Sequence, residues 1–111
     1  MENNFGDRIR TLRIKSKMLQ RELASSLEID TPMLSKIERG ERKAKREMIS
    51  KFAELFNEDN NNLLTLWLAD QICEVTKDEE VALGALQIAR KSIVLHSTKN
   101  IVKAKTKNVP V

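Results

Sequence analysis

The sequence predicts an all-α protein, and three observations support that prediction. Helix-breaking residues are rare, with three Gly and two Pro in 111 residues. No segment alternates apolar and polar residues as a half-buried strand does. Apolar residues instead recur at three- and four-residue spacing, which is typical of amphipathic helices. A chain of this length that is 41% hydrophobic can build one small core, so we expect a compact bundle of short helices.

A first helix is expected from about residue 4 to residue 17, with Phe5, Ile9 and Leu12 facing the core. The segment from residue 19 to residue 40 then predicts two short helices with a tight connection. Their apolar faces are Leu23, Ala24 and Leu27 in one helix and Leu34 and Ile37 in the next. Only residues 28–30 separate the two faces, so the helices should cross steeply, as in a helix-turn-helix that reads DNA.

The second of these helices has a clear start signal and a distinctive exposed face. Asp30 and Thr31 can accept hydrogen bonds from the first turn, and Pro32 is tolerated there. With Leu34 and Ile37 buried, the opposite face carries Thr31, Pro32, Ser35 and Lys36. Small hydroxyl, apolar and cationic side chains suit contacts with base edges and thymine methyls. An ordinary solvated face of a bundle would have a similar pattern.

Three motifs in order carry a family resemblance. They are I-R-T-L-R at residues 9–13, L-Q-R-E-L-A at residues 19–24 and L-S-K-I-E-R-G at residues 34–40. From residue 5 to about residue 56 the chain resembles the phage repressor/Cro-like (Xre) family of helix-turn-helix transcriptional regulators. The resemblance implies a lambda-repressor-like five-helix domain followed by one additional helix, double-stranded DNA as the partner, and a bacterial or phage origin.

The resemblance also implies roles for individual residues. Gln20 would contact a phosphate, Thr31, Pro32 and Lys36 would read bases with Ser35 beside them, and Arg13 would pair with Glu38. The basic run after the third motif should follow the recognition helix onto the DNA backbone. The full candidate DNA-binding set is Gln20, Arg21, Thr31, Pro32, Ser35, Lys36, Arg39, Arg42, Lys43 and Arg46. The chain departs from the family at Glu28, where Gly is common, which leaves the turn conformation open.

Charge and composition limit the other classes of protein. The net charge is +4, and the basic excess lies in residues 1–47 and 99–111, which suits a protein with one DNA-binding end. Many proteins of similar charge bind no nucleic acid. No apolar stretch is long enough for a membrane span, and the first residues do not resemble a signal peptide. The single cysteine, Cys73, fits a reducing compartment, so we expect a cytoplasmic protein.

The following segments predict two more helices, at about residues 46–56 and 62–75. The second has a nearly continuous apolar run at residues 63–69, more than one core-facing stripe can bury. We therefore expect a homodimer interface at Leu64, Trp67 and Leu68, with Trp67 as its anchor. Burial of Trp67 in the monomer core is the alternative.

A capping box at residues 76–79 should open a last helix containing Val81 and Ile93. The expected organisation is a DNA-binding domain at residues 1–70, a helical self-association extension at 71–97, and a basic tail without regular structure at 98–111. The same C-terminal helices could instead bind a different protein, as in an antitoxin.

Signals of catalysis are weak. His96 has no second ligand at metal-binding spacing, Cys73 fits a buried thiol, and no phosphate-binding loop occurs. We expect no enzyme activity, no cofactor and no metal. The sequence favours a dimeric, sequence-specific transcriptional regulator on an inverted-repeat operator, either a repressor or the controller of a neighbouring operon such as a restriction-modification system.

Overall fold

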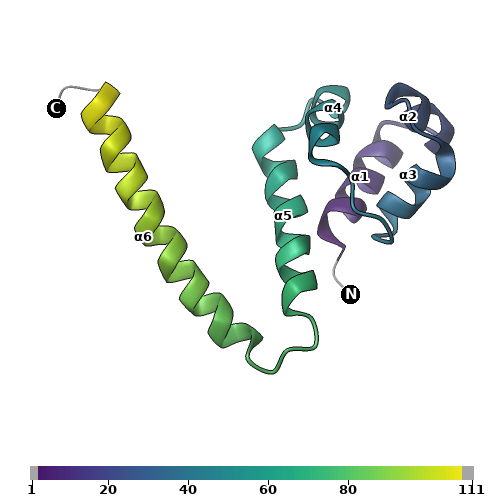
Figure 1. The fold of residues 1–111 in the computed structure, drawn as a ribbon. Coiled ribbons are helices and arrows are strands. Elements are labelled where there is room, and N and C mark those ends of the chain that lie inside the picture. The colour runs from purple at the N-terminus through teal and green to yellow at the C-terminus, as the bar shows by residue number, and fades with distance from the viewer. Residues whose placement is uncertain (1–2, 109–111) are drawn as a thin grey trace. The chain divides into compact units, whose positions relative to one another are not determined.

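The computed structural model describes residues 3–108, and the side chains of residues 3–97. These residues form helices without strands, as expected (Figure 1). The helices are α1 (Asn4–Lys15), α2 (Gln20–Ser26), α3 (Thr31–Glu38), α4 (Arg46–Phe56), α5 (Asn60–Thr76) and α6 (Ala82–Asn108). The chain divides into two compact units, Met1–Val75 and Thr76–Val111. The division falls later than the expected domain end at residue 70, because α5 continues without a break to Thr76.

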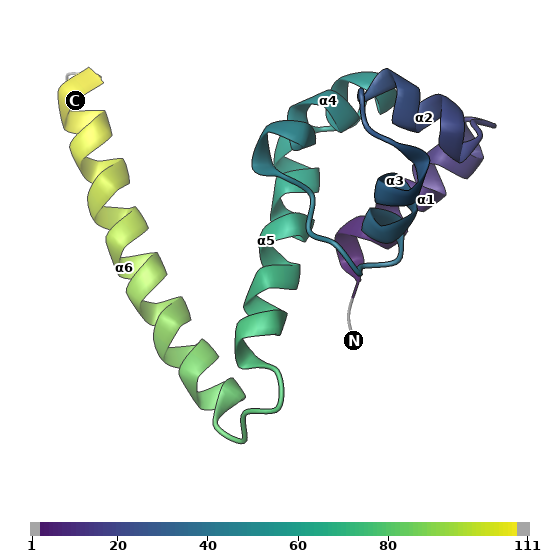
Figure 2. The ribbon, with the colours of Figure 1, turned by 45° about the vertical axis from the view of Figure 1, so that its right-hand side comes forward.

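The first unit packs five helices around one hydrophobic core. Figures 1 and 2 both show α2 and α3 on the side of this unit that lies away from α5. The rings of Phe5 and Phe52 meet edge to face, with centroids 5.7 Å apart, the geometry that aromatic pairs prefer. The buried apolar residues are Phe5, Ile9, Leu12, Leu23, Ala24, Leu27, Leu34, Ile37, Ala44, Met48, Ile49, Phe52, Ala53, Leu63 and Trp67. The core stripes expected for the first three helices are therefore confirmed.

Gly6 lets α1 approach the end of α3 closely. A Cβ atom at this position would lie 2.5 Å from the carbonyl oxygen of Ile37 and 2.7 Å from that of Glu38. These distances are well inside van der Waals contact, so a larger residue would push the two helices apart. The N-terminal half of α1 is thus held against the C-terminal end of α3.

The inner face of α5 is attached to the loop after α3 and to the start of α1. Leu63 is fully buried, and the indole N–H of Trp67 donates a 2.8 Å hydrogen bond to the carbonyl oxygen of Ala44. The Asp70 carboxylate accepts hydrogen bonds from the backbone N–H groups of Asn4 and Phe5, each at 2.9 Å. Asp70 therefore satisfies donors at the start of α1 that the helix itself cannot pair.

Trp67 is only 9% exposed, which corrects its expected role as anchor of a dimer interface. The apolar run at residues 63–69 does not reveal which face of α5 turns inward. In the structure the indole faces the core, where Ala44 satisfies its N–H group. Trp67 therefore stabilises the first unit.

Two helix boundaries differ from those expected from the sequence. Lys17, with φ of 59°, adopts the left-handed conformation, so α1 ends at Lys15 instead of Lys17. Residues 76–79 do not open the last helix as expected, because Thr76 is the last residue of α5 and α6 begins at Ala82. Between them Asp78 has φ of 62°, a left-handed conformation.

The second unit consists mainly of α6. Its large apolar side chains within the described residues are exposed, among them Leu83, Ile88, Ile93 and Leu95. The helix continues to Asn108, whereas the sequence led us to expect a tail without regular structure from residue 98. Between residues 98 and 108 the chain has neither Gly nor Pro, so nothing local interrupts the helix. Residues 109–111 of the expected tail lie outside the described residues.

Candidate nucleic-acid interface

The turn between α2 and α3 depends on a residue in an unusual conformation. Glu28 has φ of 59°, the left-handed region in which Gly is favoured and other residues are strained. Its N–H donates to the carbonyl oxygen of Ser25 at 3.1 Å, and the next N–H, of Ile29, donates to Ala24 at 3.0 Å. The turn therefore has the backbone conformation of a glycine turn although the residue is Glu.

The start of α3 is fixed by a side-chain cap. Asp30 Oδ1 accepts a 2.8 Å hydrogen bond from the N–H of Met33, and Pro32 occupies the first turn, where its missing N–H costs nothing. Leu34 and Ile37 are buried, so the helix presents the opposite face outward. Pro32 and Lys36 are exposed on that face, and Thr31 and Ser35 are half-buried.

The end of α3 is held by a buried carboxylate. Glu38 is 2% exposed and accepts hydrogen bonds from Arg13 Nε at 2.7 Å and Arg13 Nη2 at 3.1 Å. The ion pair implied by the family resemblance is thus confirmed. Arg13 also donates to the carbonyl oxygen of Met18 at 2.9 Å. Because the charge of Glu38 is paired in a bidentate geometry, it can remain buried.

Gln20 joins the same network. Its Nε2 atom donates to Glu38 Oε1 at 3.1 Å, so the carboxylate ties α1, α2 and α3 together. The amide nitrogen of Gln20 carries a second hydrogen, which remains able to donate to a phosphate at the start of α2. The contact with a phosphate stays a prediction, and the structure adds a positioning role.

The candidate arginines are exposed, and one of them has internal partners. Arg39 donates to the hydroxyl of Ser35 and forms an ion pair with Glu41. That hydrogen bond lowers the pKa of the Glu41 carboxyl and raises the pKa of Arg39, so both remain charged at neutral pH. Arg21 lies in the first turn of α2, and Arg42 and Arg46 lie after α3. All three are exposed.

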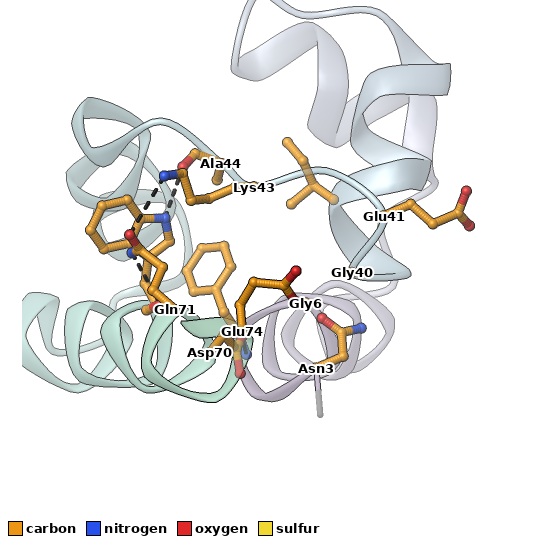
Figure 3. Close-up of a pocket in the computed structure, with 12 residues that line it drawn as sticks. Asn3, Gly6, Gly40, Glu41, Lys43, Ala44, Asp70, Gln71 and Glu74 are labelled. Atoms are coloured by element: carbon orange, nitrogen blue, oxygen red, sulfur yellow. Dashed lines mark hydrogen bonds between the residues drawn. The ribbon is translucent and has the colours of Figure 1, made fainter. Parts of the chain in front are cut away.

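Lys43 differs from the other candidate cations. Its Nζ atom lies 5.8 Å from the centroid of the Trp67 ring and 3.5 Å from Gln71 Oε1 (Figure 3). A cation over an indole face is attracted by the ring quadrupole. The side chain is therefore directed to α5, and the structure does not place it with Lys36 and Arg39. The basic run in the sequence gave no signal of this direction.

A cavity of about 390 Å³ lies beside Lys43, between α1, the loop after α3, and α5. Figure 3 shows polar side chains of α5, including Gln71 and Glu74, at its edge. Phe5, Ile37 and Trp67 supply apolar walls. The cavity therefore lies where the end of the recognition helix approaches α5.

Two residues near the recognition helix were not predicted from the sequence. Asn3 Nδ2 donates to the backbone carbonyl of Glu38 at 2.7 Å. Arg10 lies beside Gln20, Ser35 and Arg39 around a hollow of about 600 Å³. The spacing of Arg10 and Arg13 was an available signal, because residues three apart share one face of a helix.

The candidate dimer residues are distributed over two faces of α5. Leu64 is half-buried and Leu68 is 43% exposed. Ile72 and Val75 are 47% and 79% exposed, and they continue the same helical face at one-turn intervals. We call Leu64, Leu68, Ile72 and Val75 the outer stripe of α5; Trp67 lies on the opposite, inner face.

Comparison with known proteins agrees with this geometry. The family described as "Helix-turn-helix" matches residues 9–59, which include α2, the turn at Glu28 and α3. No curated protein and no solved structure matches the chain significantly. Among the described side chains, no group of three His, Cys, Asp or Glu residues could hold a metal ion. None of the helices within residues 3–108 is long and apolar enough to cross a lipid bilayer.

A three-helix anchor around Glu38, a tight turn at Glu28 and an outward-facing α3 define a helix-turn-helix protein. Its domain belongs to the phage repressor/Cro-like (Xre) type. The chain is accordingly a DNA-binding transcriptional regulator.

Proposed function

We propose that this protein binds a specific operator through α3 and does so as a symmetric dimer. The observation that carries the proposal is the exposed face of α3 on a helix fixed at both ends. Asp30 caps its start and the Glu38 network holds its end. A rigid reading helix binds at lower entropic cost than a mobile one.

In the proposed complex, the N-terminal half of α3 enters the major groove. Thr31 and Lys36 supply a hydroxyl and an ammonium group for base edges, and Pro32 supplies an apolar surface for a thymine methyl. Ser35 lies between them and accepts from Arg39. Gln20, Arg21, Arg42 and Arg46 are assigned to phosphates, which fix the orientation of the domain on the duplex.

The proposed dimer contact is the outer stripe of α5. Its exposed apolar residues follow one helical face, while the inner face is bound to Ala44 and the start of α1. A twofold axis through this stripe would place two recognition helices in successive major grooves, so the operator would contain two inverted half-sites about one helical turn apart.

The second candidate is a protein that regulates transcription while its C-terminal helix binds a different protein, as an antitoxin does. Exposed apolar residues occur around α6, not on one stripe. A helix with apolar residues on every side usually requires more than one neighbour. Self-association through α5 and partner binding through α6 are compatible.

Two measurements test the proposal. Selection from a pool of random duplexes should enrich one inverted repeat, and failure to enrich any sequence would contradict specific binding. Sedimentation equilibrium at micromolar concentration should give a dimer for the parent and a monomer for Leu68→Glu. The matched control is Leu55→Glu on α4, because Leu55 is also 43% exposed but lies outside the stripe. A monomeric parent, free and on its operator, would refute the dimer.

A further inference from the structure

A hollow beside the recognition helix brings together residues from three helices. Its volume is about 600 Å³, and its wall includes Arg10 from α1, Gln20 from α2 and Ser35 from α3, with Arg39 directly after α3. These four side chains all carry hydrogen-bond donors. One of them, Gln20, is a residue to which the proposed function already gives a phosphate contact.

The acidic residue at the base of the hollow is already neutralised. Glu38 also borders the hollow, but its carboxylate is buried and is occupied by Arg13 and Gln20. Its charge is therefore compensated from within the protein and does not require Arg10. The remaining acidic residue of the wall, Asp7, is exposed to solvent.

Arg10 is the side chain in this wall to which neither a structural role nor a DNA contact has been assigned above. It is exposed, and it makes no ion pair with any side chain that the structure describes. Arg8, two residues earlier on α1, differs because it pairs with Glu58. Positions two apart on a helix point about 200° away from each other, so Arg8 and Arg10 serve different surfaces.

We propose that this hollow binds one phosphodiester group of the DNA backbone, with Arg10 and Arg39 as its two cationic ligands. Gln20 contributes its second amide hydrogen and Ser35 its hydroxyl. The planar guanidinium of Arg10 can donate two parallel hydrogen bonds to phosphate oxygens. Arg39 exchanges its pairing with Glu41 for the phosphate when DNA binds.

The inference rests on the proposed function and deepens it, because it gives α1 a direct contact with DNA. Ligands from three helices around one phosphate would fix the angle at which α3 enters the groove. Contacts with phosphates position a protein without reading sequence. Arg10 should therefore affect binding to every duplex equally.

The test compares two charge-removing substitutions on the same helix, Arg10→Gln and Arg8→Gln. The probe is a fluorescein-labelled 20-base-pair duplex of random sequence, titrated by anisotropy at four salt concentrations. Arg10→Gln should weaken binding several-fold and reduce the slope of log affinity against log salt by about one. Arg8→Gln should leave the slope at the parental value. Matching thermal melts would show that both variants are folded.

A charge change of the opposite sign provides a second measurement. Asp7→Asn removes the exposed carboxylate from the wall of the hollow, so it should strengthen binding to the random duplex. Equal slopes for the parent and Arg10→Gln, together with unchanged affinity for Asp7→Asn, would overturn the phosphate site while leaving DNA binding intact. A parent that binds no duplex at low salt would overturn both this inference and the proposed function.

Discussion

The indole N–H of Trp67 and the carbonyl oxygen of Ala44 are joined by a 2.8 Å hydrogen bond across 23 residues of sequence. The bond fixes α5 to the loop that follows the recognition helix. Trp67→Phe keeps the apolar contact but leaves the buried carbonyl of Ala44 without its donor, so the free energy of unfolding should fall by about 2 kcal/mol. Urea unfolding followed by circular dichroism measures the change. A variant as stable as the parent would show that water replaces the indole.

Glu38 should be more important for stability than for DNA contact. Glu38→Gln removes the charge that compensates Arg13 in a largely buried site, and the expected loss is about 3 kcal/mol. The double variant Arg13→Met, Glu38→Leu should recover part of it, because no unpaired charge remains. Thermal melts of the three proteins decide the matter, and equal melting temperatures for parent and Glu38→Gln would contradict the assignment.

Glu28→Gly should stabilise the protein by about 1 kcal/mol, because Glu28 occupies the left-handed region at φ of 59°. The control is Lys51→Gly at an exposed position inside α4, where Gly should destabilise by about 1 kcal/mol. Denaturant unfolding should therefore show a higher free energy of unfolding for Glu28→Gly and a lower one for Lys51→Gly. Destabilisation by both substitutions would mean that the side chain of Glu28 has a stabilising contact in solution.

Substitution of Thr31 or Lys36 by Ala should affect specificity. Each change should cost about 1–3 kcal/mol at the selected operator and relax the preference at one or two base positions. Binding to random duplex should change far less. Anisotropy titrations on both duplexes measure the ratio of operator affinity to random-duplex affinity. If both variants keep the parental ratio, this face of α3 does not read bases.

The basic residues after α3 should separate into two groups. Removal of Arg42 and Arg46 should reduce the salt slope by about one for each lost phosphate contact. Lys43→Gln should leave the slope nearly unchanged, because its ammonium group lies over Trp67. A reduced slope for Lys43→Gln would show that this side chain leaves the indole when DNA binds.

Local patterns predicted much of the fold and of the reading face. The spacing of Ile9, Leu23, Leu34 and Ile37 defined the core sides of α1 to α3, and all four are buried. The family resemblance implied the pairing of Arg13 with Glu38. In each case the relevant signal lies within a helix or a motif.

The features that sequence did not predict depend on contacts between distant residues. Nothing near Asp70 indicates that its carboxylate binds the backbone at the start of α1. The run around Trp67 is apolar on most sides, so periodicity could not distinguish a core position from an interface. The polar residues near Thr76 suit a helix start as well as a helix end, and the continuity of α5 decided between them.

The two faces of α5 also have a consequence for operator architecture. Its inner face is bound through Trp67 and Asp70 to the helices that position α3. No flexible linker therefore separates the proposed dimer contact from the recognition helix. Such a dimer would accept only one separation between the two half-sites. One base pair added between the half-sites would turn the second half-site by about 35° around the duplex axis. Two α3 helices held rigidly by α5 could not both stay in the major groove at that spacing.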